Sequence, residues 1–240
     1  MREIWNAARL DFIMIKPTML PAYLLVCAMA VVMGLFFSPM MAFFLIITSP
    51  LLVVSLETFT EKYGFHKLYG ILPVHRKNIT RGRFLYLYLS HFIPELAGLL
   101  LVRAAIAFQL WRLLPGVTGD VQNMIEETFD PQNMSIYTML AGLFVAFCLL
   151  FSFMQMMGQI FGVENEMKIV MITLAVVTVS ALAFFWLSDH EIIPRFQIPD
   201  LTALTPAQAV RFILIDNLAA LAGNAVFCEI TAAKVSQREL

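Results

Sequence analysis

The sequence predicts an all-α membrane protein, a single domain over residues 1–240 with six transmembrane helices, and three observations lead to this fold class. First, 60% of the residues are hydrophobic, only 14% are charged, and the mean hydropathy is +0.79. A soluble domain of this length needs more polar surface than that. Second, apolar segments long enough to cross a bilayer recur along the chain. Third, the basic residues gather in the polar segments on one side of those crossings.

Residues 1–16 form the first predicted element, an amphipathic helix in the plane of the lipid headgroups. Trp5 suits an interfacial anchor because its ring is apolar while its N–H can reach water. The alternative is an ordinary start to the first transmembrane helix. On a helical wheel, five apolar side chains share an arc of about 100° with three basic side chains beside it: Ile4, Trp5, Ala8, Phe12 and Ile15, with Arg2, Arg9 and Lys16.

Six apolar segments follow, each near the length of about 20 residues that a helix needs to cross the hydrocarbon. The first two are joined only by Ser38-Pro39, which predicts a tight hairpin. Prolines within these segments are tolerable, because neighbouring helices can satisfy the carbonyls that a proline leaves free. The predicted spans are 17–37, 40–56, 84–110, 136–157, 168–188 and 209–230.

A long polar segment, residues 57–83, separates the second span from the third. Within it Phe65, Leu68, Tyr69 and Leu72 recur at helical spacing, so they form an apolar stripe on one side of a short helix. Pro73 ends that helix, because it lacks an N–H and disfavours helical geometry before it. Such a stripe needs a second surface, and three remain open: lipid headgroups, the rest of the protein, or a soluble partner.

The basic residues predict the orientation. Twelve lie on one side of the predicted crossings and three on the other, with Arg103 inside the third span. This excess predicts that both termini are cytoplasmic. The outer three are Arg112, Arg195 and Arg211, and the inner twelve are Arg2, Arg9, Lys16, Lys62, Lys67, Arg76, Lys77, Arg81, Arg83, Lys168, Lys234 and Arg238.

The chain carries no familiar motif for hydrolysing a nucleotide or holding a catalytic metal. None of its eleven glycines is followed by Lys, which excludes a phosphate-binding P-loop, and His190-Glu191 is not followed by a second His at metal-binding spacing. The three cysteines lie in apolar segments and read as small buried hydrophobes. A bundle without such a motif must draw on an ion gradient or on a partner.

Ionisable residues inside predicted spans are the usual sign of a path through the bilayer, because each costs about 2.5–3.5 kcal/mol to insert. Glu95, after Pro94 and near the middle of the third span, is the strongest candidate. Arg103 lies two turns further, too far for a direct ion pair, and Asp216 lies near the start of the last span. Glu95 has three open roles: a hydrogen bond within the bundle, a substrate path, or a proton relay.

The polar segment resembles the permease subunits of ABC-2 type exporters, in particular the small bacterial ones. The resemblance rests on Glu61-Lys62, Lys67-Leu68-Tyr69 and Leu72-Pro73-Val74-x-Arg76-Lys77-x-Ile79, between the second and third of six spans. A fainter match involves Gln159, Gly162 and Glu164 at the end of the fourth span. Gly64 and Gly70 are departures that weaken a helix here.

The resemblance implies a bacterial plasma-membrane exporter in which two permeases, identical or paralogous, work with two separate ATPase subunits. ATP and Mg²⁺ would then bind to the ATPase, with no cofactor on this chain and no nucleic-acid partner. The short cytoplasmic helix would be the coupling helix that docks on the ATPase. Its contact residues would be Phe65, Leu68, Tyr69 and Leu72, with His66, Lys67, Arg76 and Lys77 at the rim.

Two other classes of function stay open. A membrane-embedded enzyme would use His91, Glu95 or Asp216, and such enzymes usually gather several polar residues at one depth near an interface. A non-transporting membrane subunit, such as an immunity or sensor protein, is the other. The apolar bundle and its few internal charges favour an amphipathic peptide or lipid-like cargo if the chain transports. A neighbouring gene for a lone ATPase would separate the exporter from both.

Overall fold

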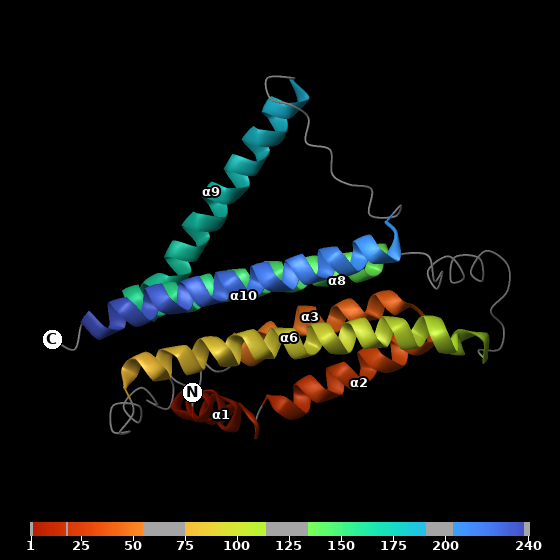
Figure 1. Ribbon diagram of the computed structural model, residues 1–240, viewed down its shortest axis with the longest axis horizontal. Coiled ribbons are helices and arrows are strands. Elements are labelled where there is room, and N and C mark those ends of the chain that lie inside the picture. Colours follow the sequence, from red (N-terminus) through yellow and green to blue (C-terminus); the bar gives the residue numbers. More distant parts are fainter. Residues whose placement is uncertain (1, 18, 55–74, 114–133, 191–203, 238–240) are drawn as a thin grey trace.

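The computed structural model describes residues 2–17, 19–54, 75–113, 134–190 and 204–237, and within these ranges the chain is helical with no strand. In Figure 1, helices α6 (Arg76–Phe108), α8 (Ser135–Phe161) and α10 (Pro206–Gln237) run side by side along the long axis of the molecule. Together with α1, α2 and α3 they form a helical bundle. The remaining helix, α9, contacts α8 near its start and then diverges from the bundle.

Three described helices are long and apolar enough to cross a membrane: Arg76–Phe108, Ser135–Phe161 and Pro206–Val235. A fourth crossing results if α1 (Arg2–Ile15) and α2 (Leu20–Phe36) count as one bent span. Shorter apolar helices, Pro39–Val54 and Met171–Ser180, coincide with the predicted second and fifth spans. The chain therefore has the character of a membrane protein, and the total of six spans stays a prediction.

The predicted N-terminal helix is present as α1, and it turns by 84° from the direction of α2. Ala8 and Ile15 of the predicted apolar arc are buried, whereas Trp5 and Phe12 are exposed. Helix α1 packs across the first turns of α6 at Gly82. A Cβ atom at Gly82 would lie only 2.5 Å from the Cβ of Ala7, so the close approach of the two helices requires glycine there.

The predicted hairpin at Ser38-Pro39 lies between α2 and the 3-10 turn η1 (Pro39–Ala42), where the Ser38 hydroxyl accepts from the Met40 N–H at 3.3 Å. The second predicted span, 40–56, is not one uninterrupted helix. Helix α3 (Phe43–Thr48) ends before Ser49, and the chain is helical again over 50–54. Pro50 causes this break because it lacks an N–H, and the Ser49 hydroxyl donates instead to Ile46 O at 2.7 Å.

Two predicted boundaries differ from those observed. The third span was predicted to begin at residue 84, but α6 begins at Arg76, because the polar residues of its first two turns pack against α1 and α10. The turn between α8 and α9 (Val163–Asp189) is reduced to Gly162, whose φ of +86° favours glycine. Helix α9 therefore begins at Val163, five residues before the predicted start of the fifth span.

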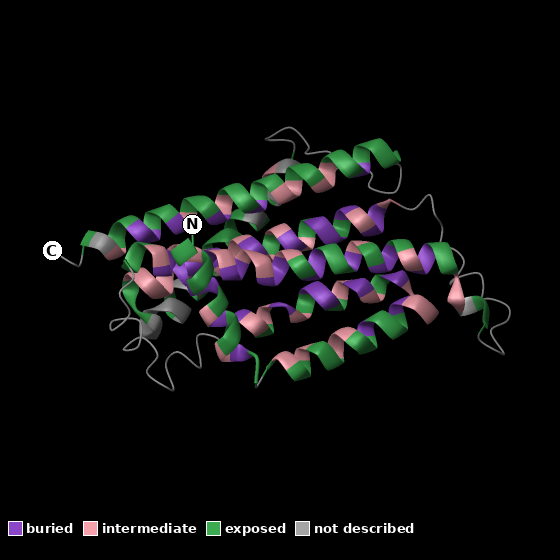
Figure 2. Ribbon diagram, turned by 60° about the horizontal axis from the view of Figure 1, so that its bottom comes forward, coloured by how far each residue is buried: buried purple, intermediate pink, exposed green. Residues whose placement is uncertain are grey.

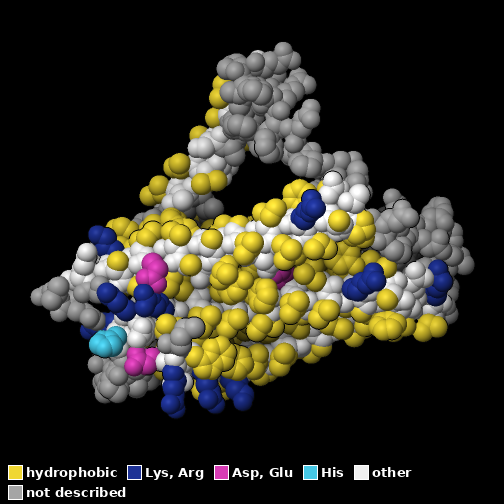
Figure 3. All heavy atoms as spheres, in the orientation of Figure 1, with side chains coloured by type: hydrophobic (Ala, Val, Ile, Leu, Met, Phe, Trp, Pro, Cys, Tyr) yellow, Lys and Arg dark blue, Asp and Glu magenta, His cyan; other side chains and the backbone are white. Residues whose placement is uncertain are grey.

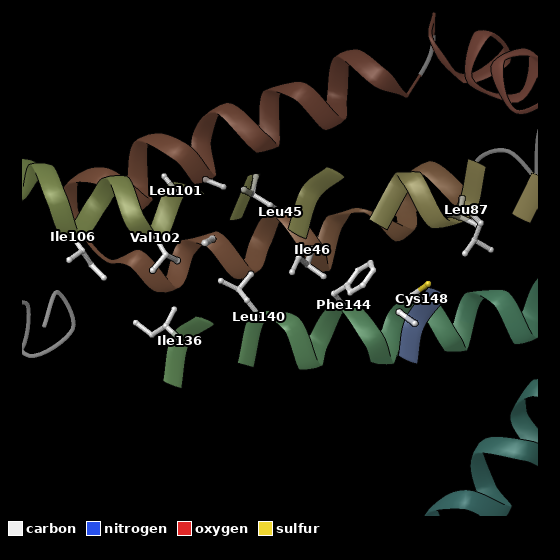
Figure 4. Packing of buried hydrophobic residues seen from close by; sticks show 14 residues of the cluster. Leu45, Ile46, Leu87, Leu101, Val102, Ile106, Ile136, Leu140, Phe144 and Cys148 are labelled. Atoms are coloured by element: carbon white, nitrogen blue, oxygen red, sulfur yellow. The ribbon is translucent and has the colours of Figure 1, made fainter. Parts of the chain in front are cut away.

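The core lies where α2, α3, α6 and α8 meet, around a cluster that includes Ile46, Leu140 and Phe144 (Figure 4). Phe144 also makes edge contacts with Tyr88 and Phe92, with ring centroids 6.0 and 6.2 Å apart. In Figure 2 the buried residues face the inside of the bundle and the exposed ones its outside. Many of the exposed residues are large and apolar, as expected for helices whose outer faces contact lipid.

Candidate functional site

Polar side chains form a continuous line between α6, α8 and α10, and we call this line the polar seam. Those on α6 recur on one face of that helix, so they all point toward the other two helices. From the first of them to the last, the seam extends over about 22 Å along α6. Its members are Thr80, His91 and Glu95 of α6, Ser152 and Gln159 of α8, and Asn217 and Asn224 of α10.

Three hydrogen-bonded contacts connect the helices along the seam. Near the start of α6, the Thr80 hydroxyl donates to Gln159 Oε1 at 3.2 Å. Further along, the side-chain amide of Asn224 donates to Ser152 Oγ at 2.8 Å and approaches the carbonyl of Phe84 at 3.4 Å. These contacts fix the positions of the three helices along one another. If one helix shifted along its axis, a polar group would be left unpaired in an apolar interior.

The third contact involves Glu95, which is only 1% exposed. The Asn217 amide donates to Glu95 Oε1 at 2.8 Å and to Ile213 O, one turn back on its own helix, at 2.9 Å. Asp216 is half-buried beside Asn217, and its carboxylate is close enough to Glu95 for the two to interact electrostatically. The seam thus brings a buried carboxyl, an amide and a second carboxyl together.

His91 lies one helical turn from Glu95 and is fully buried, with its ring centroid 5.5 Å from that of Phe151. Its Nδ1 is 2.9 Å from Leu87 O, so that nitrogen carries the proton and donates it to the carbonyl. Nε2 is then an acceptor, and within the described residues it has no hydrogen-bond partner. The imidazole therefore offers one unused acceptor to the interior of the seam.

The predicted intramembrane residues divide into two groups. Glu95, His91 and Asp216 come together at the seam, whereas Arg103 is exposed and pairs with Tyr137 of α8. Arg103 thus lies apart from Glu95, in accordance with the predicted separation along α6. Among the described residues, no group of three or more His, Cys, Asp or Glu side chains could hold a metal ion.

Sequence reasoning did not find the two amides of α10. Asn217 and Asn224 are seven residues apart, so they lie on the same face of an otherwise apolar helix. This spacing was the available signal, because polar residues that repeat at i and i+7 in an apolar helix usually face other helices. Ser152 gave no comparable signal, since a serine can satisfy its hydroxyl on its own helix.

The end of the bundle that carries both termini is also the basic end. Figure 3 shows Lys and Arg side chains gathered there, and hydrophobic side chains over the middle of the helices. Arg81 forms two hydrogen bonds of 2.8 Å with the carboxylate of Glu229, which ties α6 to α10. Asn78 donates to Glu3 at 2.6 Å, which ties α6 to α1. These contacts hold the first turns of α6 against α1 and α10.

Arg76 and Lys77 are the first two residues of α6, and both are exposed. They are the two predicted partner-contact residues that the structure describes. The other six, Phe65, His66, Lys67, Leu68, Tyr69 and Leu72, lie outside the described residues, as does the predicted coupling helix. Arg76 and Lys77 belong to the basic end. Of the twelve Lys and Arg that the structure describes, nine lie at this end and three toward the opposite end.

Comparisons of the chain with protein-family models, with curated proteins and with solved structures found no match.

The contact between Glu95 and Asn217 leads to a test of the role of the charge. We expect Glu95→Gln to leave the thermal unfolding temperature of the purified protein nearly unchanged, because the side-chain amide keeps an oxygen acceptor of similar position and volume. Glu95→Leu should lower stability by about 1 kcal/mol through the lost hydrogen bond. The double variant Glu95→Leu/Asn217→Leu should lower the free energy of unfolding by less than the sum of the two single variants. A Glu95→Gln protein as unstable as Glu95→Leu would show that the charge itself is required.

Proposed function

We propose that the chain is the permease subunit of an ATP-driven ABC exporter of the ABC-2 type. In this proposal it moves cargo outward across a bacterial plasma membrane, and a separate ATPase docks on the segment 57–83. ATP and Mg²⁺ bind to that ATPase. The chain supplies the transmembrane path and the docking surface.

One observation carries the proposal. The motif that resembles ABC-2 permeases runs directly into α6, and its last residues form the first turn of that helix. Arg76 and Lys77 are exposed there, while Ile79 is buried in the bundle. The last residues of the motif therefore include both an exposed basic pair, Arg76 and Lys77, and a residue that packs into the bundle, Ile79. This is the arrangement expected of a segment that connects a soluble partner to transmembrane helices.

Helix α6 also suits the transmission of movement from such a partner. It is one helix of 33 residues, about 50 Å long, from Arg76 at the basic end to Phe108 at the other. A long helix moves as a unit when a force acts on its end. A displacement at Arg76 would therefore reach Glu95 and the contact with Asn217. The polar seam is then where movement of the ATPase would change the packing between α6 and α10.

The proposal also includes the orientation of the chain in the membrane, with the basic end on the cytoplasmic side. The basic end carries both termini, and an excess of Lys and Arg is typical of the cytoplasmic side. An ATPase that uses cellular ATP must dock on that side. Two copies of the permease, or two paralogues, would form the working unit with two ATPases. The apolar bundle with its few internal charges favours an amphipathic peptide or lipid-like cargo.

A membrane-embedded enzyme is the second candidate function, and one observation favours it. His91 and Glu95 lie within one helical turn of each other on α6, and Asn217 of α10 contacts Glu95. His91 and Glu95 are, however, 0% and 1% exposed, so neither opens on a substrate site in the described part of the chain. The permease remains the better-supported function. An immunity or sensor subunit would lack the ATPase partner altogether.

Purification of the chain from its native membrane tests the proposal. We expect a separate P-loop ATPase to co-purify in mild detergent, and the complex in lipid nanodiscs to hydrolyse ATP. Replacing the P-loop Lys of that ATPase should abolish hydrolysis while leaving the complex intact, because this Lys contacts the phosphates and not the permease. If the chain purifies without an ATPase and no neighbouring gene encodes one, the proposal fails.

A further inference from the structure

A groove of about 380 Å³ lies between α1, α2 and α6, where α1 turns away from α2. This volume falls within the range of about 300–1,000 Å³ typical of small-molecule sites. Apolar side chains from the three helices form most of the walls, among them Phe12 of α1, Leu24 of α2, and Leu89 and Ile93 of α6. The groove lies outside the polar seam, on another side of α6.

The groove follows α6 from Tyr86 to Pro94, which corresponds to about 12 Å along the helix axis. Its first part lies beside α1, at the basic end of the bundle, and its last part lies near the middle of α6. Because α6 is long and apolar enough to cross the bilayer, the groove runs in the direction in which lipid chains lie. A straight apolar chain fits this path better than a compact ligand does.

The three hydroxyl groups in the walls already have hydrogen-bond partners. The Tyr86 hydroxyl donates to Leu52 O at 3.1 Å, and the Ser90 hydroxyl donates to Leu87 O at 2.8 Å. The Tyr23 hydroxyl pairs with Cys27, one turn further along α2. A ligand in the groove therefore meets walls that have few hydrogen bonds left to offer, which favours hydrocarbon over a polar molecule.

The groove lining contains a basic side chain. Arg9 of α1 is the charged side chain in the lining, and it is exposed at the end of the groove that lies closest to the basic end. Arg2 of α1 and Lys16, directly after the end of α1, are exposed. The carboxylate of Glu3 accepts the hydrogen bond from Asn78, and Asp11 is buried. A guanidinium binds phosphate oxygens with two parallel hydrogen bonds, so Arg9 suits a phosphate ester.

We propose that this groove binds an anionic phospholipid of the bilayer. One acyl chain lies along α6 between α1 and α2, and Arg9 binds the headgroup phosphate. The apolar walls match the acyl chain of such a lipid, and the cation at one end matches its headgroup. In a bilayer the headgroup likewise lies at the surface and the acyl chain extends inward from it. The site does not depend on an ATPase partner, so it holds whether or not the chain is a permease.

Photolabelling in a defined bilayer tests the site. The purified full chain is placed in phosphatidylcholine nanodiscs with a trace of phosphatidylglycerol that carries a photoreactive group in the middle of one acyl chain. Mass spectrometry should locate the cross-link on the groove walls. Leu24→Trp should suppress labelling because the larger ring fills the groove. Leu25→Trp is the matched control, since Leu25 is the adjacent residue, is 65% exposed against 55% for Leu24, and does not line the groove.

The phosphate contact is tested with charge variants in the same assay. Arg9→Gln should reduce labelling at least tenfold, because it removes the charge-assisted hydrogen bonds to the phosphate. Arg9→Lys should keep most of it, and Arg2→Gln should change it by less than about twofold, since Arg2 does not line the groove. Each variant is first shown to elute and unfold like the wild type. Equal labelling of Arg9→Gln and wild type, equal effects of Trp at 24 and 25, or equal labelling by a phosphatidylcholine probe would overturn the proposal.

Discussion

Replacing Leu68 and Tyr69 together with Asp is expected to abolish binding of the proposed ATPase partner while the chain still inserts into the membrane. Both residues belong to the predicted apolar stripe of the segment 57–83, and apolar and aromatic anchors carry most of the energy of an interface. Each Asp puts a charge into a contact that excludes water, at a cost of several kcal/mol while it stays ionised. The measurement is the amount of ATPase that co-purifies with each variant, relative to the amount of the variant itself.

The control for this variant is Tyr63→Asp, which adds a charge to the same segment. With helical spacing, Tyr63 lies on the side opposite the stripe, so this variant should retain the ATPase. The amount of each permease in the membrane is measured in parallel to exclude a failure of insertion. If the double variant still holds its partner, the stripe is not the docking surface, even where an ATPase is present.

Gly82→Val is expected to detach α1 from α6. A Cβ atom at residue 82 would lie 2.5 Å from the Cβ of Ala7 and 2.9 Å from the backbone carbonyl of Ile4. Neither atom belongs to the end of a flexible side chain, so the helices themselves must separate. Overpacking of this kind costs about 1–3 kcal/mol. We expect a lower thermal unfolding temperature, together with faster thiol labelling of a cysteine placed at the buried residue Ala8.

Gly142→Val is the matched control, because a Cβ atom at residue 142 of α8 would meet no other atom within 4 Å. It should leave stability and labelling near those of the parent protein. A second pair of variants tests whether crowding between residues 82 and 7 is the cause. Gly82→Ala combined with Ala7→Gly should be more stable than Gly82→Ala alone, since it removes the closest contact. Equal stability of the Val variants at 82 and 142 would show that the close approach of α1 is not needed.

The sequence alone determined that this chain forms apolar helices long enough for a bilayer. The reason is general, because a backbone in hydrocarbon must satisfy its N–H and C=O groups within its own segment, and 60% of the residues are hydrophobic. The amphipathic pattern of residues 1–16 likewise predicted α1, since a helix exposes a fixed periodicity that local sequence reveals. The hairpin at Ser38-Pro39 followed from the shortness of the link between the first two apolar segments.

Local sequence also pointed to Glu95 as the principal buried charge, but it could not supply its partner. The contact with Asn217 joins residues 122 positions apart in the chain. It depends on how far α6 and α10 are rotated and shifted against each other, and the packing of all the helices together sets these two quantities. The early start of α6 at Arg76 has a similar origin, since its charged first turns gain partners on α1 and α10.

Only the tertiary structure decided where these helices meet and what lies between them. The sequence placed the apolar residues of α1 on one arc, yet packing at Gly82 buries Ala8 and leaves Trp5 and Phe12 exposed. Trp5 and Phe12 line the groove between α1, α2 and α6, together with Arg9. Hydropathy determines that a side chain leaves water, but it does not distinguish lipid from protein, because both are apolar. The choice between them depends on the shapes of neighbouring helices, and those exist only once the chain is folded.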